Sequence, residues 1–71
     1  MNELASLDVL IAPNRIHFLK FIIEGYDGLA MLTTIDQQLG HVRLRFAGGA
    51  CDEVRALLLG LESQLGRLEY L

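Results

Sequence analysis

Between residues 16 and 23 the apolar positions cover more of a helix surface than one buried face requires. At 100° per residue they sweep more than half of the circumference, which leaves a narrow polar stripe of His17, Lys20 and Glu24. One side of such a helix can pack on a sheet, and the other side needs a partner. The apolar residues are Ile16, Phe18, Leu19, Phe21, Ile22 and Ile23.

We expect this helix to span about residues 14–24. A strand over residues 16–23 is the alternative, but its apolar residues would occupy both faces, so the alternation typical of a strand fails. The spacing of Lys20 and Glu24 also suits an ion pair along a helix. Residues 25–28 contain two glycines that tolerate positive φ, which predicts a helix C-cap and a tight turn.

An alternating pattern precedes this helix. Leu7, Val9 and Ile11 recur at a period of two, which predicts a strand that is buried mainly on one face. Pro13 ends that strand and suits the first turn of a helix. Asn14 can accept a hydrogen bond from an unpaired backbone N–H at that point, so we expect it to help start the helix.

Two further strands and a second helix follow. The β-favouring residues 29–35 predict a strand, and residues 36–40 predict a hairpin loop. Apolar and polar residues alternate over residues 41–46, which predicts a strand with one solvent-exposed face. A helix is expected over about residues 51–65, and residues 68–71 suit either a short last strand or a frayed tail. The apolar stripe of the second helix is Val54, Leu57, Leu58, Leu61 and Leu65.

This order of elements predicts an α+β fold of the ferredoxin-like type, β-α-β-β-α with a possible last strand. Such a fold is a two-layer sandwich in which two helices cover one face of an antiparallel sheet. Its first and third strands are central, so we expect Asp8 near Arg43 or Arg45 on the open face. We expect one domain over residues 7–71, preceded by a tail over residues 1–6.

Length and composition favour burial between subunits. A chain of 71 residues buries only about 60% of its unfolded surface and is marginally stable alone. Cys51 is the single cysteine, so no disulfide within the chain can stabilise the fold, whereas 52% of the residues are hydrophobic. We therefore predict a homodimer formed through Phe18, Phe21 and Ile22 or through an open edge of the sheet.

The charge of the chain argues against several classes of partner. A net charge of −3 opposes binding to phosphate backbones, so we expect no nucleic acid partner. His41, Arg43 and Arg45 form a basic row, but it lacks the aromatics that RNA-binding domains of this topology use, so pairing with Asp8 or solvent is favoured. The start of the chain is acidic and no apolar run approaches roughly 18 residues, so we expect no membrane span and a cytoplasmic location.

The run FLKFIIEGYDGLAMLTTID, followed after a short loop by GHVRLRF, resembles a family of short bacterial proteins known only as a domain of unknown function. The resemblance covers Ile11 to about Leu65, its specific part is EGYDG at residues 24–28, and it implies no activity. The topology is also similar to that of ACT domains, which bind amino acids where a first-strand loop meets a helix, near a dimer interface. The corresponding segment here is residues 12–15, where Asn14 replaces the usual glycine.

Two groups of residues are candidates for a small-molecule site. Asn14 and Arg15 lie where helix N–H groups are unpaired, so a small carboxylate could bind there, although helix capping and a solvated arginine are the alternative. The turn after the first helix holds two carboxylates and a phenol, which suit either acid–base chemistry or a simple C-cap turn. The candidate ligand-binding residues are Asn14, Arg15, Glu24, Tyr26, Asp27 and Gly28.

The sequence contains no recognisable catalytic or metal-binding motif. His17, His41 and Cys51 show no short chelating spacing, so we expect neither a metal nor another cofactor. Cys51 at the start of the second helix is a candidate nucleophile, but Asp52 and Glu53 oppose thiolate formation and favour a structural thiol. The predicted function is therefore a non-enzymatic homodimerising interaction or regulatory module, with an ACT-like domain that binds a small molecule as the alternative.

Overall fold

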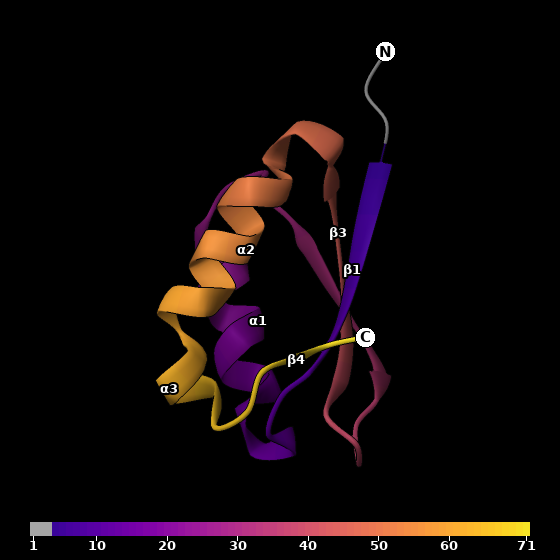
Figure 1. The fold of residues 1–71 in the computed structure, drawn as a ribbon, viewed down its shortest axis with the longest axis vertical. Helices are drawn as coiled ribbons and strands as arrows, with labels where there is room; N and C mark the ends of the chain where they lie inside the picture. Colours follow the sequence, from indigo (N-terminus) through magenta and orange to yellow (C-terminus); the bar gives the residue numbers. More distant parts are fainter. Residues whose placement is uncertain (1–3) are drawn as a thin grey trace.

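In the computed structural model, which describes residues 4–71, four strands form one antiparallel sheet and the helices cover one of its faces (Figure 1). The strands follow the order β2-β3-β1-β4, which confirms the predicted ferredoxin-like α+β sandwich. The strands are β1 (Leu4–Leu10), β2 (Met31–Asp36), β3 (His41–Ala47) and β4 (Glu69–Tyr70). The helices are α1 (Ile16–Gly25), α2 (Cys51–Gly60) and α3 (Glu62–Leu65), and short 3-10 turns at Pro13–Arg15 and Gly48–Ala50 precede α1 and α2.

The centre of the sheet is the antiparallel pair β1 and β3. Val9 lies opposite Val42 on the face that the helices cover, and Asp8 lies opposite Arg43 on the open face. The alternation predicted for the third strand is thus confirmed, because side chains of successive residues point to opposite faces. The buried core consists of Val9, Ile11, Ile16, Leu19, Ile23, Val42, Leu44, Phe46, Val54, Leu58 and Leu65.

The ends of the chain differ from the sequence-based boundaries. Strand β1 begins at Leu4, which lies opposite Ala47, so residues 4–6 belong to the sheet, and the rest of the expected tail, residues 1–3, lies outside the described residues. Residues 68–71 contain the short strand β4, and the Leu71 N–H donates to the Asp8 carbonyl oxygen at 2.9 Å. Strand pairing uses backbone groups, so it extends beyond the residues that show an apolar pattern.

The helices also differ from expectation at their ends. Asn14 does not cap α1, because the 3-10 turn places Ala12 at its N-cap position, and no side chain caps either element. The predicted second helix is interrupted at Leu61, directly after Gly60, so α2 and α3 are separate. No helix in residues 4–71 combines the length and apolar character needed to cross a membrane.

The predicted ion pair between Lys20 and Glu24 does not form. Within residues 4–71 the ion pairs are those of Asp8 with His41 and Arg43, and that of Arg67 with Glu69. Lys20 and Glu24 are both exposed, so a direct pair would gain little in water. Their charges therefore remain without a partner on α1.

Candidate functional site

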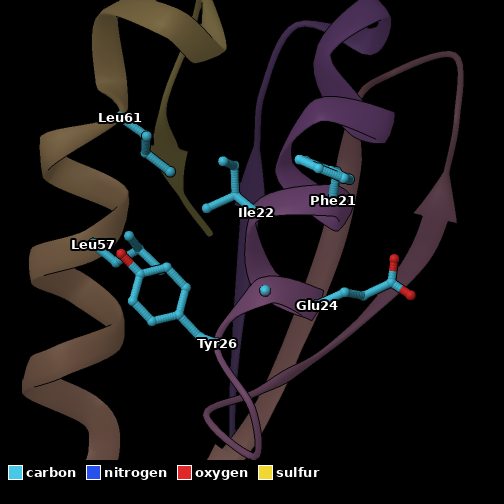
Figure 2. A pocket seen from close by; sticks show the side chains of 7 residues that line it. Phe21, Ile22, Glu24, Tyr26, Leu57 and Leu61 are labelled. Carbon is cyan, nitrogen blue, oxygen red and sulfur yellow. The ribbon is translucent and has the colours of Figure 1, made fainter.

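A groove of about 590 Å³ runs between α1 and α2 on the outer side of the helical layer (Figure 2). Its walls are mainly apolar, and Glu24 is the one charged residue in its lining. The lining residues are Phe21, Ile22, Glu24, Gly25, Tyr26, Leu57 and Leu61. The groove is open to solvent, so its apolar surface is available to another molecule.

Helix α1 contributes one wall because its apolar residues exceed what the sheet can cover. Leu19 and Ile23 point to the sheet and are buried, whereas Phe21 projects from the opposite side and is 75% exposed. Ile22 lies between these directions and points into the space between the helices (Figure 2). Phe18 is half-buried against the core, and the Arg15 guanidinium lies 5.8 Å from its ring centroid.

Helix α2 and the residue that follows it supply the opposite wall. Leu57 and Leu61 are four residues apart, so both occupy the edge of α2 that faces α1. Both are half-buried, unlike Val54 and Leu58, which point directly into the core. The sequence places Leu57 and Leu61 in the apolar stripe of the second helix, but it does not indicate that they form a groove wall.

The end of α1 closes the groove. The Tyr26 N–H donates to the Ile23 carbonyl oxygen at 3.1 Å, which fixes the backbone where the chain leaves the helix. The Tyr26 ring reaches toward Leu57, while the Glu24 carboxylate points away from α2 (Figure 2). The groove thus has an aromatic end and an acidic rim rather than a polar floor.

The structure separates the two halves of the predicted small-molecule site. Asn14 and Arg15 lie before the first residue of α1, whereas Glu24 and Tyr26 lie at its end. A helix of 10 residues is about 15 Å long, so one small ligand does not reach both groups.

Asp27 and Gly28 line a second hollow of about 390 Å³ on the other side of the Tyr26 turn. Glu53 also lines this hollow, so two carboxylates face it. Like charges there oppose the binding of a small carboxylate. The predicted ligand residues therefore lie in three places, and Tyr26 lines both the groove and the second hollow.

The charged cluster on the open face of the sheet consists of side chains that hydrogen-bond to one another between two strands. Arg43 Nε donates to Asp8 Oδ1 at 2.8 Å and Arg43 Nη2 donates to Asp8 Oδ2 at 3.0 Å, while His41 Nε2 lies 2.9 Å from Oδ2. The hydrogen bonds from Arg43, and then from His41, lower the pKa of Asp8 from 3.8 to about 2. Of the two arginines predicted to lie near Asp8, Arg43 pairs with it, and Arg45 lies exposed opposite Ser6. The Asp8 carboxylate therefore stays ionised at neutral pH and joins β1 to β3.

The remaining candidates for chemistry lie apart. Cys51 is half-buried at the start of α2 and has no disulfide partner, and His17 is exposed on α1. Across residues 4–71 no three His, Cys, Asp or Glu side chains lie together in a way that could hold a metal ion.

Comparison with known families shows which family the chain resembles. The model of a family described as Domain of unknown function (DUF4911) matches residues 9–64, which is well over half of the chain. The chain belongs to this family. Neither the curated proteins nor the solved structures give a significant match.

Membership in the DUF4911 family agrees with the resemblance seen in the sequence. The matched region runs from β1 into α3 and includes all residues that line the groove between α1 and α2. The short strand β4 lies outside it. The groove thus lies within the part of the chain that matches the family.

The Asp8 cluster predicts a specific acid sensitivity. Asp8 binds its proton less readily in the folded chain than in the unfolded chain, so its contribution is present above pH 3.8 and is lost as the pH falls toward about 2. Asp8→Asn should lower the free energy of unfolding at pH 7 by about 1 kcal/mol, after allowance for solvent screening. The stability of this variant should also not fall through the loss of the Asp8 charge as the pH is lowered. Urea unfolding of both proteins between these pH values measures the difference. Parallel stability curves would contradict the assigned role.

Proposed function

We propose that this protein is a non-enzymatic module that forms a homodimer through the apolar surface of α1 and acts as an interaction or regulatory subunit. The observation that carries the proposal is the groove between α1 and α2, with Phe21 exposed at its rim. Phe21, Tyr26, Leu57 and Leu61 all line this groove, whose surface is mainly apolar. Soluble monomers rarely leave such a surface uncovered unless it binds something.

The size of the domain supports self-association. A chain of 71 residues has a small core, and burial of the α1 surface against a second copy would add apolar contact that the chain cannot make alone. The partner in a homodimer is a second copy of the same chain, so it is present wherever the protein itself is. A closed two-fold dimer is the commonest arrangement for such an interface.

The charged groups favour this function over catalysis or binding of a small acid. Asp8, the carboxyl with the lowered pKa, lies on the open face of the sheet, and its hydrogen bonds with Arg43 and His41 occupy both of its oxygens. The residues suited to a small acid lie at opposite ends of α1, so they do not converge on one ligand. Of the predicted ligand residues, Glu24 and Tyr26 line the groove, and the Glu24 carboxylate points away from α2 (Figure 2).

Replacing Phe21 by glutamate should weaken the dimer at least tenfold. Phe21 is 75% exposed in the single chain, so the variant should fold, but a dimer would have to bury the new carboxylate. Leu59→Glu is the matched control, because Leu59 is 66% exposed on α2 and does not line the groove. Size-exclusion chromatography with light scattering gives the mass of each variant, and circular dichroism reports its folding.

Two results would count against this interface. In one, Phe21→Glu would dimerise as strongly as Leu59→Glu, which would place the contact elsewhere. In the other, Phe21→Glu would lose its folded spectrum, which would mean that Phe21 stabilises the single chain rather than an interface.

A further inference from the structure

The charges of α1 oppose the dipole of the helix. Arg15 precedes α1 and Lys20 lies in its N-terminal half, although the N-terminus of a helix favours negative charge. Glu24 lies in the last turn, where positive charge is favoured, and that turn has no basic residue. Helix α2 has the favourable arrangement, with Asp52 and Glu53 in its first turn. A second helix packed antiparallel to α1 would offer each end of α1 a complementary charge.

Lys20 and Glu24 are available for such a contact. Both side chains are exposed, they lie one turn apart, and within residues 4–71 the ion pairs involve other residues. Both line a hollow with Met31 and Leu32 of β2. Glu24 also lines the groove, but its carboxylate points away from α2, so the charged groups lie on the side of α1 nearer β2 (Figure 2). Ile22 marks the opposite edge of α1, beside α2. The exposed Phe21 lies between the two edges.

The positions of these edges select an antiparallel pair. A two-fold axis perpendicular to two antiparallel helices brings the same edge of both copies to the same side of the interface. The edge of α1 that carries Lys20 and Glu24 then lies against the same edge of α1 in the partner subunit. The two apolar edges also lie against each other. A parallel pair would instead place Lys20 and Glu24 against the apolar edge that contains Ile22, which would leave their charges poorly solvated.

We propose that two copies of this chain pair through antiparallel α1 helices, with Lys20 of each copy contacting Glu24 of the partner subunit. A two-fold axis that passes beside Ile22, midway between Lys20 and Glu24, forms both of these Lys20–Glu24 contacts, one on each side of the axis. Phe21 then lies at the centre of the interface, next to the partner subunit's Gly25, where the space beyond the backbone is open. This inference rests on the proposed homodimer and specifies its geometry.

Charge exchange between two variants tests this geometry. Lys20→Glu and Glu24→Lys should each weaken the homodimer about tenfold, because two attractive contacts become repulsive. An equimolar mixture of these variants should form a heterodimer with wild-type affinity, since both contacts again join opposite charges. The double variant K20E/E24K should also dimerise as the wild type does, and it keeps the net charge of −3. Sedimentation velocity gives the affinities, and native mass spectrometry identifies the heterodimer.

The outcomes separate the geometry from the dimer itself. Single variants that dimerise as tightly as the wild type would overturn the antiparallel pairing, as would a double variant that fails to restore affinity. Either result would leave the homodimer in place if the wild type still dimerises. A wild-type protein that is monomeric throughout would overturn both proposals.

Discussion

Replacing Gly40 by alanine is expected to unfold most of the protein. Gly40 has a φ of +80°, and an added Cβ would overlap the carbonyl oxygen of Ile11 and lie 2.9 Å from its carbonyl carbon. The Ile11 N–H also donates to the Gly40 carbonyl oxygen at 2.9 Å, so the two backbones cannot separate without breaking this bond. We expect the free energy of unfolding to fall by about 4 kcal/mol, which is close to the whole stability of a small domain.

Gly28→Ala is the matched control for this prediction. Gly28 has a similar φ of +75°, but no atom lies within 4 Å of the position of an added Cβ. Gly28→Ala should therefore lower the free energy of unfolding by only about 1 to 2 kcal/mol, because alanine is strained in a left-handed backbone conformation. Circular dichroism and urea unfolding measure both variants. Equal losses for Gly40→Ala and Gly28→Ala would show that the contact with Ile11 is not the cause.

Leu58→Ala is expected to give the second large effect, a loss of about 2 to 5 kcal/mol. Leu58 is fully buried at 0% exposure between α2 and the sheet, so truncation removes apolar contacts and leaves a cavity. The neighbouring Leu59 is 66% exposed, and Leu59→Ala should change stability by no more than about 0.5 kcal/mol. Urea unfolding at one fixed protein concentration compares the pair. Similar losses for the two leucines would contradict the orientation of α2.

The central elements of the fold follow from local patterns in the sequence. The alternation of residues 41–46 predicts β3 because one face of that strand is buried and the other is wet. The order of the elements also predicts the central pairing that brings Asp8 to Arg43. Both predictions rest on periodicity and on the small number of ways in which such elements pack.

The missed boundaries depend on contacts that no local pattern reveals. Leu4 joins β1 by backbone pairing with Ala47, and its exposed side chain contributes no buried position to a pattern. The break at Leu61 separates α2 from α3 although the leucine stripe continues through it. Asn14 lies inside a 3-10 turn instead of before a helix, so its capping preference is not used.

The surplus of apolar residues on α1 could be predicted, but the shape of the site could not. Periodicity indicates that Phe21 lies away from the core, and the structure agrees. The opposite wall depends on which edge of α2 lies beside α1, so Leu57 and Leu61 can be assigned to it only once both helices are placed. Long-range packing therefore determines the groove, whereas local sequence determines one of its walls.

Sedimentation equilibrium of the wild-type protein over a wide concentration range tests the central claim most directly. The chain has a mass of 7.9 kDa, and we predict that the measured mass rises with concentration to twice this value. A constant mass of 7.9 kDa at every concentration would contradict self-association through α1.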